Sequence, residues 1–193
     1  MPTDLERRIN GRVISCQAHG PEAEKALRNR SNAAYLDFAC GTGRVISYLE
    51  DLAENVTGID ISPAMLKLAA EKCKRARLIQ KDITVETNTP PEKFDLITSF
   101  RFLTNAEPEL RKQALLRLHK YLKDDGTLIV NAHSNPWSYR LVMLPFHWAS
   151  DRFVRRRPLF GYLSGRQARR LLDECGFKVV NFKWRSLLTH KKK

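Results

Sequence analysis

The chain has 193 residues, 42% of them hydrophobic and 28% charged, a balance typical of one soluble globular domain with a single core. No apolar run is long enough for a transmembrane helix, and the four cysteines are too far apart in the sequence for a zinc site or a disulfide framework, so a cytoplasmic location is expected. The formal net charge of +13 indicates attraction to nucleic acid, a membrane surface or an acidic substrate, although a solvated basic surface gives the same composition.

Residues 1–33 are polar, and Pro21 predicts the start of a helix because proline suits the first helical position. From residue 34 onward, strands and helices alternate, which is typical of parallel βαβ units. The expected strands are Ala34–Ala39, Asn55–Asp60, Arg77–Lys81, Phe94–Phe100 and Thr127–His133. The expected helices are Arg44–Ala53, Pro63–Cys73 and Glu107–Leu122. Two consecutive prolines in Thr87–Lys93 predict a loop in place of a helix.

The helix expected at Glu107–Leu122 has an apolar face that includes Leu110, Ala114 and Leu118, and Arg111 is expected to lie away from that face. Residues 134–163 then mix aromatic side chains with arginines. A further helix is expected from Ser164 or Gly165 to Cys175, and Gly176 is a suitable helix stop. Phe177–Trp184 is the last expected strand.

The turn after the first expected strand, Asp37–Gly43, contains Gly41 and Gly43, which let the backbone approach a bulky ligand. The next strand ends in Asp60, whose carboxylate can accept hydrogen bonds from both hydroxyls of a ribose. A nicotinamide dinucleotide fold uses a similar turn, but it requires a small residue where this chain has Ile46. The pattern favours a nucleoside cofactor other than a nicotinamide dinucleotide. The alternative is that these carboxylates merely terminate strands and bind no cofactor.

These residues resemble the motifs of class I S-adenosylmethionine-dependent methyltransferases, in element order over residues 34–184. The resemblance implies an α/β, Rossmann-like fold with a mostly parallel six- or seven-stranded sheet flanked by helices. It implies one domain with a helical segment (1–33), a cofactor-binding core (34–133), an acceptor-side insertion (134–163) and a C-terminal helix and strand (164–193). The antiparallel seventh strand that usually finishes this sheet is expected to be short, at Ser186–His190, or absent.

The resemblance implies S-adenosylmethionine as the cofactor and no metal. Asp60 would hold the ribose, Met65 would pack against the adenine, Asp82 would take the adenine amino group, and Asp37 would lie near the ammonium group. The implied cofactor-binding residues are Asp37, Ala39, Cys40, Gly41, Thr42, Gly43, Asp60, Ile61, Met65, Asp82, Ile83 and Ser99.

The acceptor side is defined less closely by the sequence. His133 is the candidate general base, with a structural role as the alternative, and Arg101, Tyr139 and His147 are candidates for binding the acceptor. Transfer to oxygen of a small-molecule, saccharide or lipid-linked acceptor is expected. The chain lacks the Asn/Asp/Ser-Pro-Pro-aromatic and Pro-Cys motifs of base-methylating nucleic-acid enzymes. An RNA-directed methyltransferase and a cofactor-binding regulatory protein without its own catalysis remain alternatives.

Residues 134–163 have three interpretations: a cover for a bulky acceptor pocket, a patch on anionic lipid that would make the protein peripheral to a membrane, or a stacking surface for single-stranded nucleic acid. The sequence leaves the oligomeric state open.

Overall fold

The computed structural model describes residues 12–15, 21–85, 92–100, 102–131 and 163–182. The strands are β1 (Arg12–Ser15), β2 (Ala34–Phe38), β3 (Asn55–Asp60), β4 (Arg77–Gln80), β5 (Phe94–Ser99), β6 (Leu122–Val130) and β7 (Lys178–Phe182). The helices are α2 (Pro21–Arg28), α3 (Ile46–Leu49), the 3₁₀ helix η1 (Glu50–Leu52), α4 (Pro63–Ala70), α5 (Phe102–Asn105), α6 (Pro108–Tyr121) and α9 (Gly165–Glu174). None of the helices in these ranges combines the length and hydrophobicity that a membrane crossing requires.

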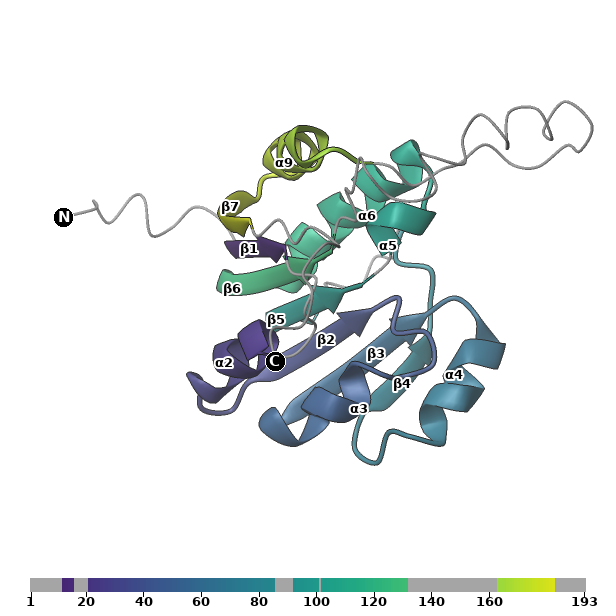
Figure 1. The fold of residues 1–193 in the computed structure, drawn as a ribbon. Helices are drawn as coiled ribbons and strands as arrows, with labels where there is room; N and C mark the ends of the chain where they lie inside the picture. Colours follow the sequence, from purple (N-terminus) through teal and green to yellow (C-terminus); the bar gives the residue numbers. More distant parts are fainter. Residues whose placement is uncertain (1–11, 16–20, 86–91, 101, 132–162, 183–193) are drawn as a thin grey trace, which may run out of the picture.

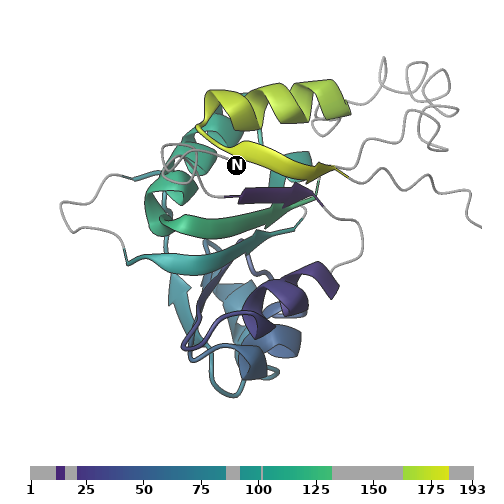
Figure 2. The same cartoon turned by 90° about the vertical axis from the view of Figure 1, so that its left-hand side faces the viewer.

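The strands form one seven-stranded sheet in the order β4-β3-β2-β5-β6-β1-β7, and every strand pair in the described ranges is parallel. Helices α2, α3 and α4 pack on one face, and α6 and α9 pack on the other (Figures 1 and 2). A parallel strand covered on both faces must be apolar along its length. The central strands β2 and β5 are accordingly buried at every residue. The predicted α/β arrangement is confirmed.

Most predicted elements are present, with shifted ends. The strand Asn55–Asp60 has the expected bounds, but the helix expected at Arg44–Ala53 is shorter and continues as the 3₁₀ helix η1. β6 begins at Leu122 and not at Thr127, because the residues expected to form a turn bulge out within the strand: its pairing with β5 jumps from Leu122 to Thr127. Between β4 and β5, residues 81–85 contain a turn and no helix, and 86–91 lie outside the described residues.

The seventh strand comes from the N-terminal region of the sequence. β1 lies between β6 and β7 and pairs in parallel with both, with Val13 opposite Leu128 on one side and Val179 on the other. The segment 1–33 therefore contains a strand as well as the predicted helix. The position between β6 and β7 is filled by this parallel strand. Ser186–His190, where the sequence left open a short antiparallel strand or none, lies outside the described residues.

Helix α6 differs from its predicted orientation. Arg111, expected to face solvent, is only 4% exposed, whereas Leu110 is 39% exposed. The buried face is formed by Arg111, Ala114, Leu115 and Leu118. The Arg111 Nε–H donates to the Ala106 carbonyl oxygen at 2.7 Å, and burial lowers the pKa of the guanidinium. The buried face of α6 is thus rotated toward Arg111. The methylene groups of Arg111 pack among apolar side chains, and its guanidinium donates to a backbone oxygen.

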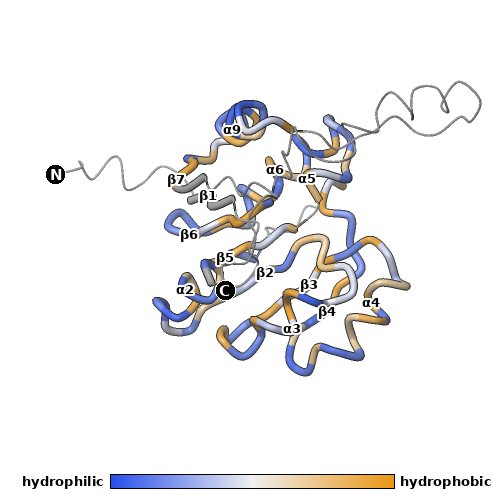
Figure 3. The backbone as a smooth tube through the Cα atoms, viewed as in Figure 1, coloured by the Kyte–Doolittle hydropathy of each residue, from blue (hydrophilic) through white to orange (hydrophobic). Residues whose placement is uncertain are grey.

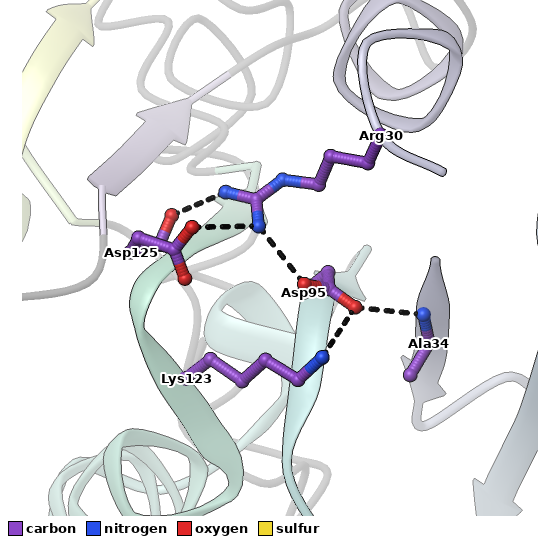
Figure 4. Close-up of polar contacts among 5 residues, drawn as sticks. All are labelled: Arg30, Ala34, Asp95, Lys123 and Asp125. Carbon is purple, nitrogen blue, oxygen red and sulfur yellow. Dashed lines mark hydrogen bonds and ion pairs between the residues drawn. The ribbon is translucent and has the colours of Figure 1, made fainter. Parts of the chain in front are cut away.

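At the amino end of the strands, Asp95 joins three segments of the chain (Figure 4). Its carboxylate accepts hydrogen bonds from Arg30 Nη1 at 2.9 Å, from the Ala34 N–H at 2.8 Å and from Lys123 Nζ at 2.8 Å. Arg30 also pairs with Asp125 at 2.9 Å. These donors and cations outweigh the burial of Asp95 and lower its pKa. The network ties the starts of β2, β5 and β6 together at the edge opposite the glycine turn.

The distribution of hydropathy follows the layers. Hydrophobic and hydrophilic colours alternate along the central strands, and hydrophilic colour dominates α9 (Figure 3). On α9, Ala168 and Leu172 face the core, while Arg166, Arg169 and Arg170 are exposed. Ser164 starts this helix with a capping box, in which its hydroxyl accepts from the Gln167 N–H and its own N–H donates to the Gln167 side chain. Gly176, at φ +86°, ends it as predicted.

Candidate active site

The turn between β2 and α3 is built on backbone conformations that side chains disfavour. Ala39, Gly41 and Gly43 all have positive φ, at +56°, +56° and +74°. For a non-glycine residue such as Ala39, this conformation is strained, and such strain concentrates at functional sites. The turn is fixed by two backbone hydrogen bonds, from the Cys40 N–H to the Ile59 oxygen and from the Gly43 N–H to the Cys40 oxygen, both at 3.1 Å. The predicted turn therefore lies directly beside the end of β3.

The two glycines of the turn have different surroundings. A Cβ placed on Gly43 would lie 3.0 Å from Cα and Cβ of Ala69 and 3.1 Å from Cys73 Sγ, so Gly43 is required for packing against α4. A Cβ placed on Gly41 would meet no atom of the described residues within 4 Å. Packing does not explain the glycine at 41. Open space beside its backbone is what the approach of a ligand requires.

Asp60, at the end of β3, holds the turn in place. Its Oδ2 accepts the Gly41 N–H at 2.8 Å, and its Oδ1 accepts the Ser62 N–H at 2.9 Å. Each carboxylate oxygen can accept two hydrogen bonds, so both oxygens retain capacity for ribose hydroxyls. The Ser62 hydroxyl in turn caps α4 by accepting the Met65 N–H. One carboxylate thus fixes the glycine turn and the start of the following helix together.

Asp37 is deeply buried, with 2% of its surface exposed. Its Oδ1 accepts the Thr98 hydroxyl at 2.6 Å, while its Oδ2 is buried and has no hydrogen-bond partner among the described residues. Burial raises the pKa of Asp37 to about 7, hydrogen bonding from the Thr98 hydroxyl and from the backbone N–H of Ile46 opposes this shift, and the negative charge of Asp60 adds to it. A buried acceptor without a partner at hydrogen-bond distance is rare in folded proteins, and a cationic group of a ligand would satisfy it.

The predicted adenine side presents exposed apolar surface. Ile61 is 67% exposed and Met65 40% exposed, on the segment that follows Asp60, while Ile83 is buried. Asp82, beyond β4, is exposed, and its Oδ1 accepts both the N–H and the hydroxyl of Thr84, which lowers its pKa. Its other oxygen takes part in neither of these bonds. Exposed apolar side chains after β3 and a carboxylate after β4 thus follow the ends of two neighbouring strands.

Other predicted residues have separate outcomes. Ser99, the last residue of β5, is buried, and its hydroxyl has no hydrogen-bond partner in the described ranges. The carbonyl oxygen of Thr42 accepts from Lys72 Nζ at 3.1 Å. Cys40 is buried, which raises the pKa of its thiol to about 12 and makes it an unreactive filler of the turn. His133, Arg101, Tyr139 and His147 lie outside the described residues, and their roles stay predictions.

Sequence reasoning missed three supporting residues, Glu50 at the amino ends of the strands and Tyr35 and Thr98 beside Asp37. Glu50 is buried, and its carboxylate accepts the N–H groups of Lys74, Arg75 and Ala76 at 2.9–3.1 Å, which lowers its pKa and joins η1 to the turn before β4. Tyr35 and Thr98 form a buried hydrogen-bond chain that ends on Asp37. Thr98 lies opposite Asp37 because β5 pairs with β2. Their contact therefore depends on the strand order, which the sequence does not show directly.

A family profile described as "Methyltransferase domain" matches residues 36–130, the stretch from β2 to the end of β6. The chain belongs to the class I S-adenosylmethionine-dependent methyltransferases. A demethylmenaquinone methyltransferase of Tropheryma whipplei is 29% identical to this methyltransferase over 180 residues, with 82% of this chain and 72% of that protein covered.

An uncharacterized methyltransferase of Geobacillus kaustophilus is 32% identical over 106 residues, which cover 53% of this chain and 48% of the relative. This methyltransferase thus spans about half the length of that relative. The solved structure of a methyltransferase from Methanosarcina mazei superimposes with a TM-score of 0.61 at 19% identity, covering 76% of this chain and 80% of that one, which shows the shared fold.

S-adenosylmethionine is the cofactor of this methyltransferase, and the residues at the strand ends fit it. Gly41 leaves room beside the backbone, and Asp60 keeps acceptor capacity for the ribose. Ile61 and Met65 offer apolar surface for the adenine, and Asp37 keeps one buried oxygen for the ammonium group. The ribose, the adenine and the ammonium group thus each have a chemically matched residue among these strand ends, and the individual roles stay predictions.

Proposed function

We propose that this methyltransferase transfers a methyl group to a small-molecule, saccharide or lipid-linked acceptor, and that the accepting atom is oxygen. The observation that carries the methyl transfer is the turn anchored on Asp60, with Gly41 open to a ligand, at the edge where β5 and β6 also end. Bound S-adenosylmethionine supplies an activated methyl group, so the protein chiefly has to align the acceptor and exclude water. The similarity to a demethylmenaquinone methyltransferase supports a small-molecule acceptor.

The residues proposed for the acceptor follow the ends of β5 and β6 in the sequence. Arg101 follows β5, and His133 follows β6 by three residues. In open parallel sheets, ligands bind beyond the carboxyl ends of the strands, and residues that follow the strands line this crevice. We assign His133 the role of accepting the proton of an acceptor hydroxyl. Arg101, Tyr139 and His147 are proposed to bind the acceptor.

Exposed positive charge on one face of the protein supports a lipid-linked acceptor on an anionic surface. Arg166, Arg169 and Arg170 are exposed on α9, where Arg170 pairs with Glu174 at 3.0 Å, and Lys112 and Lys120 are exposed on the neighbouring helix α6. The two helices are in contact, since the Cys175 thiol after α9 lies 3.9 Å from the Lys112 oxygen. Clusters of this kind bind anionic lipid surfaces. Cytoplasmic location with peripheral membrane contact stays a prediction.

The test is a transfer assay with donor labelled in its methyl group, run over demethylated quinones, phenols, sugars and RNA, with the Asp60→Ala variant as the blank. The proposal expects label on a small acceptor and none above the blank on RNA. Label on RNA alone would establish the RNA-directed alternative. Donor binding without turnover on any acceptor would favour a regulatory protein. Sedimentation with vesicles of anionic against neutral lipid then tests the surface formed by α6 and α9.

A further inference from the structure

A chain of three buried hydroxyl and carboxyl groups connects the interior of the sheet to the cofactor edge. The Tyr35 hydroxyl lies 2.7 Å from Thr98 Oγ1, which lies 2.6 Å from Asp37 Oδ1. All three residues are buried, with exposures of 0%, 0% and 2%. Tyr35 and Asp37 belong to β2, and Thr98 belongs to the neighbouring strand β5. The methyl transfer proposed above assigns no role to Tyr35 or Thr98.

The direction of the hydrogen bonds in this chain is determined. Thr98 has one hydroxyl hydrogen, which it donates to Asp37 Oδ1. The bond between Tyr35 and Thr98 must therefore be donated by Tyr35. Both hydroxyls thus point toward Asp37 and stabilise its Oδ1 as an acceptor. A proton carried by this carboxyl group must then reside on Oδ2, the oxygen that has no partner among the described residues.

The surroundings of Asp37 make it retain this proton. The titratable groups that act on it are Tyr35 on the same strand, Asp60 at the end of β3 and the thiols of Cys40 in the turn and Cys73 after α4, none of which is cationic. Burial among them raises the pKa of Asp37 to about 7, and the hydrogen bonds from Thr98 and from the Ile46 backbone N–H only partly offset this rise. In the free protein near neutral pH, the carboxyl group is therefore protonated in a large fraction of molecules.

We propose that Tyr35 and Thr98 are positioning residues that hold the Asp37 carboxyl group with Oδ2 toward the α-ammonium group of the cofactor, and that binding of this ammonium group displaces the proton from Oδ2 into solvent. The O–H bond of the carboxyl group breaks, the proton passes to the buffer, and an N–H donor of the ammonium group takes its place. The inference rests on the proposed function, because it requires the cofactor at this edge. It makes recognition of the amino-acid portion dependent on pH and on the hydroxyl chain.

The size of the effect follows from the ionised fraction of Asp37. A carboxyl group with a pKa of about 7 is ionised in about one tenth of the molecules at pH 6 and about half at pH 7, so affinity for an ammonium-bearing ligand rises about fivefold between them. Binding at pH 6 releases about 0.9 proton for each ligand bound. A nucleoside that lacks the amino-acid portion releases none.

The experiment is calorimetric titration at pH 6 and pH 7, in two buffers of different ionisation enthalpy, with the demethylated product S-adenosylhomocysteine and with methylthioadenosine, which lacks the ammonium group. The expected result is proton release at pH 6 with the first ligand only. Binding of the first ligand without proton release, or equal release with both ligands, would overturn the inference. Failure of the unmodified protein to bind either ligand would instead contradict the cofactor site itself.

Variants test the roles of the two positioning residues. Thr98→Val removes the hydrogen bond to Oδ1 and should raise the pH midpoint of product binding by about one unit. Tyr35→Phe is nearly isosteric and should shift the midpoint in the same direction by less. The control is Thr57→Val, a buried threonine of β3 that is paired with Leu36 and not with Asp37. An unchanged midpoint in both folded variants, or an equal shift in the control, would refute the positioning role.

Discussion

Alanine substitutions at Gly41 and Gly43 separate what the turn contributes to folding from what it contributes to binding. Both glycines have positive φ, +56° and +74°, where an added Cβ costs about 1–2 kcal/mol. At Gly43 the methyl group also meets Ala69 at 3.0 Å and Cys73 at 3.1 Å, an overpacking that costs about 1–3 kcal/mol more. The free energy of unfolding should therefore fall by about 2–5 kcal/mol in Gly43→Ala and by about 1–2 kcal/mol in Gly41→Ala.

Binding should separate the two variants further. The methyl group of Gly41→Ala enters space that is open in the described part of the chain, so we expect it to meet the cofactor and weaken S-adenosylhomocysteine binding by about tenfold or more. Urea denaturation gives the stability of each variant, and calorimetry gives the affinity. Equal destabilisation by both substitutions would refute the packing argument. Unchanged affinity in Gly41→Ala would refute the assignment of the open space to the cofactor.

Three further predictions concern the acidic residues. Asp95→Asn should destabilise the protein by about 2–3 kcal/mol at pH 7, measured by urea denaturation, because Arg30 and Lys123 lose their charged partner. The pKa of Asp95 is lowered on folding, so this difference should shrink as the pH falls below about 4; a difference independent of pH would contradict it. Glu50→Gln should cost about 1–3 kcal/mol, since an amide oxygen replaces a carboxylate that accepts three N–H groups, and an unchanged melting curve would refute this. The pKa of Asp37 is raised on folding to about 7, so the contribution of its protonated form is complete below the unfolded pKa and is lost as the pH rises to about 7. The melting temperature of Asp37→Asn should therefore rise relative to that of the unmodified protein as the pH is raised from 5 to 8. The same pH dependence in both proteins would exclude a raised pKa of Asp37.

The cofactor edge was predictable from the sequence because its signals are local. Apolar runs mark β2, β3 and β5, the two glycines follow directly after β2, and Asp60 ends the next strand. The strand order then brings these ends to one edge, where Gly41 and Asp60 form their hydrogen bond. In this part of the fold, local sequence and tertiary structure agree.

The features that the sequence did not reveal depend on tertiary contacts. β1 has four residues, and its pairing is with strands far along the chain, so no local periodicity marks it. Arg111 lies at the border of an apolar stripe, where helical spacing cannot decide whether a long side chain packs inward. The contact between Thr98 and Asp37 depends on the register of β5 against β2. Each of these features follows from strand order or helix rotation.

The central claim is that S-adenosylmethionine binds where Asp60 fixes the glycine turn, and calorimetric titration with the cofactor and its demethylated product tests it most directly. The unmodified protein should bind both ligands, and Asp60→Ala should lose about 2–4 kcal/mol of binding free energy, about 30-fold or more, because the ribose and the Gly41 N–H lose their acceptor together. Asp51→Ala, which removes an acid that is 85% exposed, is the matched control and should bind normally. No binding by the unmodified protein, or equal affinity in Asp60→Ala, would contradict the account.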